Sequence, residues 1–428
     1  MTTSKYWSKA KVILREQGWN GLWHAGRKKL SQKLYEQEYL GKYGLEAKIL
    51  AAYLDFSEND IKISNRVNEE NRSQLNIQSI TWLLPEFQHP FYGGIYTILR
   101  FADYLKRERH VDNRFLILGS MDEKLAAQKI GESFSALRDV SIHSLTEYDQ
   151  IKNIEPSDAI ISTLWATAYF ALRINNVKRK FYFIQDYESL FYPAGTISAQ
   201  TEATYSFGFY GIANTPPIKE IYESRFGGKA EFFLPCVDTD LFYPREPLTL
   251  LEEPYTLFFY GRPRHPRNGF ELGAHSLRIL KKRMGDRIRI ISAGDTWHPR
   301  DHDLLGVVEN LGRLTYQDTC ELYRQCRIGV TMMFTNHPSY LPLELMASGC
   351  LVITNANPAT SWILKDGYNC RLTRASATCL ADTIEEVLNM DDAEYMRITT
   401  NALDLIRSQY QDWDREIEKI FRFMCNPL

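Results

Sequence analysis

Two stretches of this 428-residue sequence have residue types that could bind a phosphorylated ligand. The first, residues 261–269, reads GRPRHPRNG and places Arg262, Arg264 and Arg267 around His265. Guanidinium groups are planar forks that match phosphate oxygens. We expect a strand before this loop and a helix after it, which predicts a position at the ligand-binding edge of a parallel sheet. A solvated basic loop is the alternative.

The second stretch, residues 335–353, reads TNHPSYLPLELMASGCLVI. Its prolines and Gly349 predict a short helix over 342–348. The unpaired amides of residues 339–341 could then face an anion. Glu344 would be repelled by a phosphate, so it is better suited to accept hydrogen bonds from a neutral diol such as ribose. A carboxylate that only complements the helix dipole is the alternative.

Composition limits the class of protein. The length predicts two or three domains. With 44% hydrophobic and 24% charged residues and a net charge of -2, the chain is typical of soluble globular proteins and gives no sign of nucleic-acid binding. It has neither an apolar run of about 18 residues, as a membrane span needs, nor the pattern of a signal peptide.

The cysteines and metal motifs favour a reduced, metal-free protein. Seven cysteines are scattered without CxxC spacing, which indicates reduced thiols in the cytoplasm and not a disulfide framework or a zinc site. HExxH, an aspartate-rich metal loop and the P-loop lysine are all missing from the sequence. We therefore expect no protein-held metal and no cofactor.

The N-terminal part has a basic, tryptophan-bearing pattern. Helical patterns cover roughly 5–17 and 22–39, and residues 1–50 hold ten Lys or Arg against four Glu, with Trp7, Trp19 and Trp23 among them. Interfacial helices on anionic membranes use this combination. The alternative is a solvated helical hairpin whose tryptophans pack on the main body.

From residue 79 onward, short strands alternate with helices. Strands are predicted at 79–84, 115–118, 159–162, 180–184, 211–213 and 231–234, which indicates a parallel sheet with helices on both faces. After the first strand, Gly93 and Gly94 could allow close approach of a ligand, or form an ordinary turn. Asp186 and Glu188 follow the 180–184 strand, where they could handle a substrate or cap a turn.

A proline-bearing segment at 235–247 predicts a domain boundary. Beyond it the alternation restarts, with strands expected at 255–260, 288–292 and 328–332. The domains are therefore predicted as a helical extension at 1–76, a first α/β domain at 77–242 and a second at 243–408.

Four segments together resemble the GT-B fold glycosyltransferases: YGRPRHPRNG, ENLGRLTYQD, NHPSYLPLELMASG and VDTDLFYP. They look most like the large retaining family with two glutamates separated by seven residues, and within it like bacterial rhamnosyltransferases of surface-layer glycan assembly. The resemblance covers most of the chain after residue 79. It implies two Rossmann-like domains that face each other across a cleft, with a last helix, 409–428, that returns to the first domain.

The resemblance also implies roles for individual residues. Glu344 matches the glutamate that holds the donor ribose, and Arg262 matches the arginine that contacts the diphosphate. The other donor-binding positions match a glycine loop, a base-binding loop and phosphate-facing amides: Gly93, Gly94, Gly312, Leu314, Ser339, Tyr340 and Leu341.

Two positions depart from the family pattern. The first glutamate of the pair is replaced by Asn336, and the family lysine before the glycine is replaced by Asn268. The negative charge of the phosphates would then be neutralised by Arg264 or Arg267. These changes affect the expected donor sugar more than the reaction type.

The function expected from the resemblance is transfer of a hexosyl group to a hydroxyl of a growing, lipid-linked glycan. The expected sugar is rhamnose, and the expected donor is dTDP-rhamnose. The reaction would be metal-independent and retaining, at the inner face of the plasma membrane. Arg262 and Arg264 would stabilise the leaving diphosphate, and Asp186 and Glu188 would handle the acceptor. The alternatives are a non-catalytic nucleotide-sugar-binding subunit, and an epimerase or phosphorylase.

Overall fold

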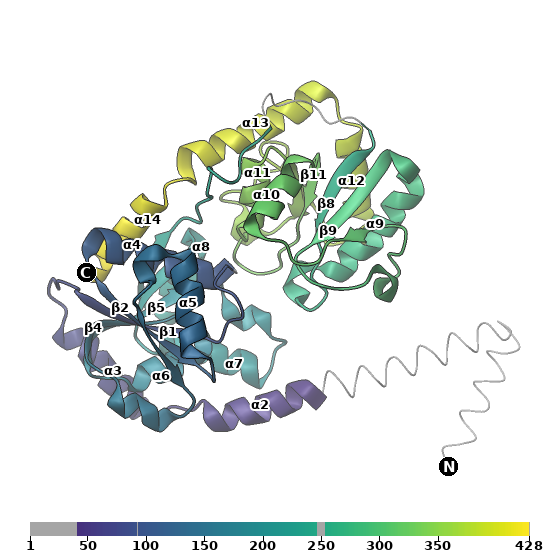
Figure 1. The fold of residues 1–428 in the computed structure, drawn as a ribbon. Helices are drawn as coiled ribbons and strands as arrows, with labels where there is room; N and C mark the ends of the chain where they lie inside the picture. The colour runs from purple at the N-terminus through teal and green to yellow at the C-terminus, as the bar shows by residue number, and fades with distance from the viewer. Residues whose placement is uncertain (1–40, 92, 246–252, 428) are drawn as a thin grey trace, which may run out of the picture. The chain divides into compact units, whose positions relative to one another are not determined.

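The computed structural model describes residues 41–91, 93–245 and 253–427 (Figure 1). The chain divides into two units, one made of residues 1–55 with 194–200 and the other of all remaining residues. Within the described residues the first unit includes α2 (Gly41–Tyr53). Both sheets belong to the second unit.

The first sheet is parallel and has seven strands in the order β3-β2-β1-β4-β5-β6-β7. Helices cover both faces of its inner strands, as a parallel sheet requires; in β1 the five residues between the two ends are all buried. The strands are β1 (Ser79–Pro85), β2 (Asp112–Leu118), β3 (Ser141–Leu145), β4 (Ser157–Ser162), β5 (Val177–Ile184), β6 (Tyr210–Asn214) and β7 (Lys229–Phe233). The helices of this part are α3 (Glu58–Glu70), α4 (Gly93–Arg109), α5 (Glu123–Ser133), α6 (Trp165–Arg173), α7 (Thr196–Ala203) and α8 (Pro216–Phe226).

The second sheet is also parallel and has six strands in the order β10-β9-β8-β11-β12-β13. They are β8 (Tyr255–Tyr260), β9 (Ile288–Ala293), β10 (Glu309–Asn310), β11 (Ile328–Val330), β12 (Leu351–Asn355) and β13 (Arg371–Thr373). The helices here are α9 (Phe270–Met284), α10 (Tyr316–Arg324), α11 (Leu341–Ala347), α12 (Ala377–Leu388) and α13 (Asp392–Gln409). The predicted α/β fold with two Rossmann-like sheets is confirmed.

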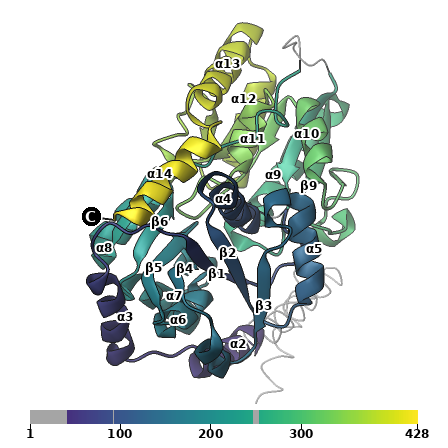
Figure 2. The same ribbon diagram turned by 60° about the vertical axis from the view of Figure 1, so that its left-hand side comes forward.

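The last helix, α14 (Trp413–Cys425), packs against the first sheet (Figure 2). Its apolar stripe, which includes Ile417 and Ile420, is buried in the same core as β1 and α4. Arg179 of β5 donates from Nη1 to the carbonyls of Met424 and Cys425, at 2.6 and 2.7 Å. A buried guanidinium thus satisfies the carbonyls at the end of this helix.

Some expectations differ from the structure or fall outside it. Strand β3 was not predicted, because its sequence SIHSL mixes polar and apolar residues at the exposed edge of the sheet. The predicted helices at 5–17 and 22–39 lie outside the described residues. None of the helices in the described part of the chain combines the length and the apolar character that crossing a membrane needs.

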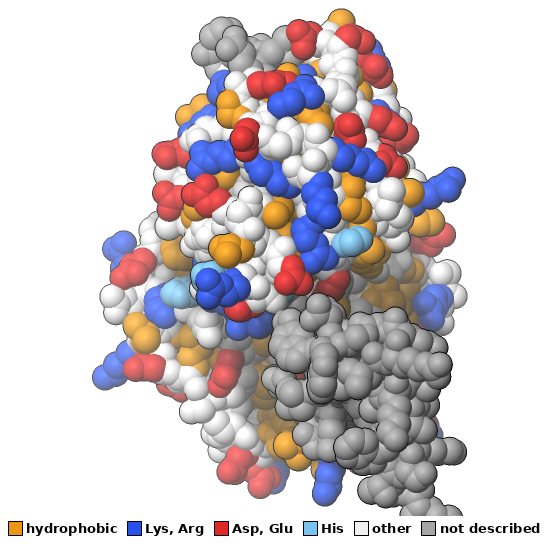
Figure 3. All heavy atoms as spheres, turned by 90° about the vertical axis from the view of Figure 1, so that its right-hand side faces the viewer, with side chains coloured by type: hydrophobic (Ala, Val, Ile, Leu, Met, Phe, Trp, Pro, Cys, Tyr) orange, Lys and Arg blue, Asp and Glu red, His pale blue; other side chains and the backbone are white. Residues whose placement is uncertain are grey.

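On one face of the molecule, basic and acidic side chains are interspersed (Figure 3). Many of these charges form ion pairs; near the end of α9, for example, Arg283 pairs with Asp382 and Glu385. Surface pairs of this kind contribute little to stability. They do mean that the positive charges of α9 have neighbours of opposite sign.

We predict that Arg179→Met lowers the melting temperature strongly, because the carbonyls of Asn71 and Met424 would lose their donor and the Cys425 carbonyl would keep only the Leu75 amide. Hydrogen bonds to charged groups contribute roughly 1.5–3 kcal/mol each, so we expect a loss of about 3 kcal/mol or more. Lys178→Met is the matched control, since Lys178 forms a half-exposed ion pair with Asp158. Equal melting temperatures for the two variants, measured by calorimetry, would contradict the role of Arg179.

Candidate functional site

A cavity of about 720 Å³ lies between elements of the two sheets in the second unit. One wall comes from α4 and the segment 236–238, which follow β1 and β7. The opposite wall comes from the ends of β8 and β9, the loop 313–317 and the start of α11. The carboxyl ends of parallel strands therefore face this space, which is where α/β sheets bind their ligands.

Helix α11 places Glu344 in the cavity lining. Ser339, before the helix, has φ 67°, a left-handed conformation that costs a residue with a Cβ about 1–2 kcal/mol. Within the described residues no side-chain or backbone donor reaches the Glu344 carboxyl. Burial, and then the negative charge of Asp238, raise the pKa of Glu344 to about 8. The cavity thus contains a carboxyl group whose acceptor capacity is unused.

Aromatic rings surround this carboxyl. Tyr323 packs edge-on against Phe258, with ring centroids 4.9 Å apart. The ring centroids of Tyr96 and Tyr316 are 5.4 Å apart. All four line the cavity together with Leu314. Such a wall suits a flat ring, because aromatic faces contribute stacking without demanding a particular hydrogen-bond pattern. The carboxyl next to it suits a group with hydroxyl donors.

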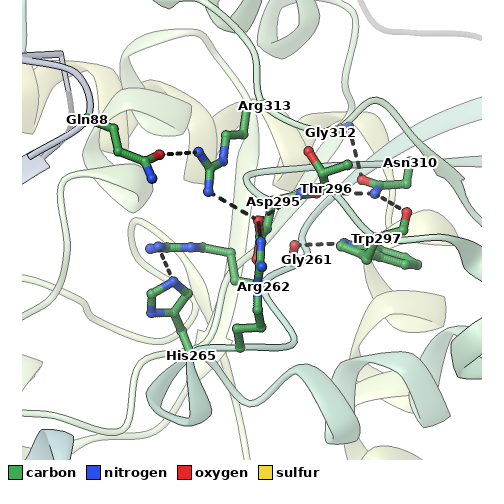
Figure 4. A network of polar contacts seen from close by, with 11 residues as sticks. Gln88, Gly261, Arg262, His265, Asp295, Thr296, Trp297, Asn310, Gly312 and Arg313 are labelled. Carbon is green, nitrogen blue, oxygen red and sulfur yellow. Dashed lines mark hydrogen bonds and ion pairs between the residues drawn. The ribbon is translucent and has the colours of Figure 1, made fainter.

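The arginines of the 261–269 loop have different surroundings; Figure 4 labels Arg262 beside His265, and Asp295 beside Arg313. Arg264 donates to both carboxylate oxygens of Asp295, at 3.0 and 2.6 Å. Arg313 lies 3.6 Å from the same carboxylate, which also accepts from the Thr296 amide. Hydrogen bonding to Arg264 lowers the pKa of Asp295 to about 2. Arg264 is therefore held by a carboxylate that stays ionised at every physiological pH.

Arg262 and Arg267 form no ion pair with a carboxylate among the described residues. Arg262 donates to the Tyr260 hydroxyl at 3.0 Å and contacts His265 Nε2 (Figure 4). Burial, together with the charges of both arginines, lowers the pKa of His265 to about 4, so the imidazole is neutral and accepts. Arg267 lies over the Phe191 ring at 4.4 Å. Two cationic side chains are thus available to an anion.

Asn268 does not face the cavity. It is 1% exposed, and its Nδ2 donates to the Met332 carbonyl at 3.4 Å. The positive charge next to this position comes from Arg267. The Asn268 amide therefore holds the backbone just after β11 and contributes no charge to the loop.

The remaining glycine positions differ in their surroundings. Gly93 lines the cavity at the start of α4, and an added Cβ there would have no atom within 4 Å. A Cβ on Gly94 would lie 2.8 Å from Gln185 Nε2, so Gly94 allows a close approach of that side chain. Gly312 has φ 72°, which favours glycine, and its carbonyl accepts from the Gly294 amide at 2.8 Å.

Asp186 and Glu188 do not line the cavity. Asp186 is 8% exposed and accepts from the Thr335 hydroxyl at 2.6 Å. Glu188 accepts from the Trp165 amide at 2.7 Å and from the Tyr182 hydroxyl at 3.2 Å. Burial raises their pKa values, to about 6 for Asp186 and about 8 for Glu188. Their expected role with the acceptor remains a prediction.

The structure thus brings part of the expected set to one cavity. Its lining includes Gly93, Leu314, Ser339, Tyr340, Leu341 and Glu344. Residues outside the lining, in neighbouring loops or in the interior, are Gly94, Asp186, Glu188, Arg262, Arg264, Arg267, Asn268, Gly312 and the half-buried Asn336.

An ion pair in the cavity wall was not predicted from the sequence. Arg100 of α4 lies 2.5 Å from Asp238, and its guanidinium is 5.0 Å from the Tyr96 ring and 4.9 Å from the Trp413 ring. Tyr96, Thr97 and Arg100 share one face of α4 by their spacing. This spacing is the signal that the sequence offers for the ion pair, but a polar face of a helix normally indicates a face exposed to solvent.

The chain matches one described family in both halves. Residues 80–213 match the family described as WsaF, N-terminal domain, and residues 255–385 match WsaF, C-terminal domain. The O-antigen biosynthesis protein RfbC of Myxococcus xanthus is 37% identical over 362 residues, which cover 83% of this chain. The chain spans only 28% of the length of that relative.

Solved structures share the fold at low identity. HepE from Anabaena, in complex with UDP and glucose, matches with a TM-score of 0.63 and 14% identity, over 82% of this chain and 100% of that one. A TarM variant of S. aureus, in complex with Fondaparinux, alpha-GlcNAc-glycerol and UDP, matches with a TM-score of 0.64 and 10% identity, over 82% and 100%. Sucrose-phosphate synthase from Thermosynechococcus elongatus matches with a TM-score of 0.60 and 13% identity, over 81% and 98%.

We predict that Glu344 makes folding stability depend on pH. Its pKa is raised in the folded state, so its contribution is fully present below about pH 4.5 and is lost as the pH rises through about 8. Glu344→Gln should therefore be increasingly stabilising, relative to the wild type, from pH 5 to pH 9. Melting temperatures of both proteins across this range test the prediction; a constant difference would contradict it. Other groups, such as Glu188, titrate in both proteins, so their contributions cancel in the difference between the two melting temperatures.

Proposed function

Because this chain belongs to the WsaF-like glycosyltransferases of the GT-B fold, we propose that it transfers a hexosyl group from a nucleoside-diphosphate sugar to a hydroxyl of a growing bacterial glycan. The observation that carries the proposal is the cavity itself. A half-buried carboxyl that no described donor reaches, an aromatic wall and two arginines that form no ion pair with a described carboxylate lie along neighbouring strand ends. A ribose diol, a base and a diphosphate need these three environments.

In this proposal each part of the donor meets a chemically matched group. The ribose hydroxyls donate to Glu344, and the base lies between Leu314 and the aromatic wall. The diphosphate takes the charge of Arg262 and Arg267. When the bond to the sugar breaks, negative charge develops on the leaving diphosphate, and preoriented cations stabilise that charge. His265 orients Arg262 by accepting its hydrogen bond.

The resemblance supports finer assignments that form part of the proposal. The donor sugar is rhamnose, supplied as dTDP-rhamnose, and it meets Asn336, where an uncharged amide replaces the family's carboxylate. The anomeric configuration is retained and no metal takes part, since arginines neutralise the diphosphate. The acceptor is lipid-linked. The enzyme works in the cytoplasm at the membrane surface, to which the basic residues of segment 1–50 are attracted.

A second candidate is a non-catalytic nucleotide-sugar-binding subunit of a glycan assembly complex. Asn336 favours it, because this position has no charge to stabilise an oxocarbenium-like sugar. Turnover separates the two candidates. Donor binding by calorimetry without any transfer or donor hydrolysis across a panel of glycan acceptors would favour the subunit.

We predict that Arg262→Ala and Arg267→Ala each weaken UDP or dTDP binding, because each removes a cation that forms no ion pair with a carboxylate of the described residues. The loss of one charge-assisted hydrogen bond corresponds to roughly a 10- to 150-fold change in Kd. Arg264→Ala is the matched control from the same loop, since Arg264 is already held by Asp295. Calorimetric titration of the nucleotide selected by a thermal-shift screen measures the three affinities. Equal losses in all three variants would contradict this division of roles.

We also predict that donor binding releases a proton at pH 7.5. Free Glu344, with a pKa of about 8, is largely protonated at this pH, whereas hydroxyl donors from ribose favour the ionised form and lower its pKa. Titrations in two buffers of different ionisation enthalpy measure the release. A nucleotide sugar is the ligand of choice, because its phosphates do not titrate near this pH. Glu344→Gln should abolish the release; an unchanged release in this variant would rule out Glu344 as its source.

A further inference from the structure

One segment of the second α/β domain, residues 335–340, contacts the first α/β domain at both of its ends. At the first end, Thr335 is 2% exposed and its hydroxyl donates to Asp186 Oδ2 at 2.6 Å. Asp186 follows β5 of the first sheet, and its Oδ1 accepts from the Tyr187 amide at 2.8 Å. Both oxygens of this buried carboxylate are therefore engaged, one of them across the domain boundary.

The second end is Tyr340, immediately before α11. Its hydroxyl lies 3.2 Å from the Thr97 hydroxyl of α4 and accepts from Asn214 Nδ2, at the end of β6, at 3.0 Å. Its ring stacks on Trp413 of α14, with centroids 6.0 Å apart and planes inclined by 28°. Three elements of the first sheet's domain, visible together in Figure 2, thus surround a side chain of the other domain.

The segment between these two ends has a conformation that needs support. Ser339 is left-handed, and its amide donates to His337 Nδ1 at 2.9 Å. In its own domain, the segment is held at the first end by Asn357, whose Nδ2 donates to the Thr335 carbonyl at 2.7 Å. Strained backbone persists only where surrounding contacts fix it. Here the contacts at the Tyr340 end come from the other domain.

We propose that Asp186, Thr97 and Asn214 are positioning residues that hold the segment 335–340 from the opposite domain, so that the diphosphate and sugar part of the donor site is complete only when the two domains are in contact. The proposal rests on the proposed function in one respect, namely that Asn336 and the Tyr340 amide face the donor. The Ser339 and Leu341 amides, which were also expected to face an anion, already donate to His337 Nδ1 and to Ser339 Oγ. The contacts also assign Asp186 a role through Thr335, and not a direct contact with the acceptor.

Two isosteric variants remove these contacts one at a time. Thr335→Val deletes the hydroxyl that binds Asp186, and Thr335→Ser is its matched control because it retains the hydroxyl. Tyr340→Phe deletes the other hydroxyl and keeps the ring on Trp413. Hydrogen exchange of the free protein, followed by mass spectrometry on peptides covering 335–345, should become faster in Thr335→Val and Tyr340→Phe and unchanged in Thr335→Ser. Peptides of α9 serve as an internal reference.

Binding should separate the two parts of the donor. Uridine and thymidine, which reach only Glu344 and the aromatic wall, should bind equally well to all variants. UDP, dTDP and their sugars should bind about three- to tenfold more weakly to Thr335→Val and Tyr340→Phe, because each variant loses a hydrogen bond that positions the segment and not one that contacts the ligand. Thr335→Ser should restore wild-type affinity. A general loss of folding would weaken the binding of nucleosides and nucleotides alike, and that result would overturn the proposal.

The exchange measurement needs no ligand, so it decides the proposal separately from the proposed function. Unchanged exchange in both isosteric variants would overturn the positioning role, whatever the binding results. If the wild-type protein bound no nucleotide at all, the proposed function would fail, and faster exchange in 335–345 would still establish that the opposite domain holds this segment.

Discussion

The return of α14 to the first sheet is the constraint on which the cavity depends. Trp413, at the start of this helix, belongs to the core of the first sheet, lies under the guanidinium of Arg100 and stacks on Tyr340. Arg179 binds the carbonyls at its other end. Helix α14 follows the second sheet in the chain and packs on the first sheet. The two walls of the cavity are therefore joined by the chain itself as well as by side-chain contacts.

The distribution of counter-charges decides what the loop after β8 can do. Three arginines are close together in sequence, yet only Arg264 has a carboxylate partner, Asp295. The other two, Arg262 and Arg267, are partly buried and oriented by a neutral imidazole and an aromatic ring. Neither forms an ion pair with a described carboxylate, so their charge is less fully neutralised than that of Arg264.

Burial also separates the roles of the acidic residues. The guanidinium of Arg264 lowers the pKa of Asp295 to about 2, whereas burial and the negative charge of Asp238 raise the pKa of Glu344 to about 8. Asp186 lies between these extremes, because its hydrogen bonds offset part of the burial. The Asp295 carboxylate therefore holds Arg264 in place, and the Glu344 carboxyl is available to hydroxyl groups of a ligand.

Much of the fold could be predicted from the sequence, because strand and helix periods are local: the strand at 255–260 and the helix around Glu344 are where the pattern indicated. The family resemblance was likewise readable from short segments, since it depends on residue types at fixed spacings. Pairings between distant residues were not readable. Tertiary structure alone decided that Arg264 is held by Asp295 while Arg267 is not, that Asn268 faces the interior, that Arg100 joins Asp238, and that Asp186 contacts Thr335. Each of these depends on which strand ends lie side by side, and a sheet's strand order is set by packing over the whole chain and not by any local pattern.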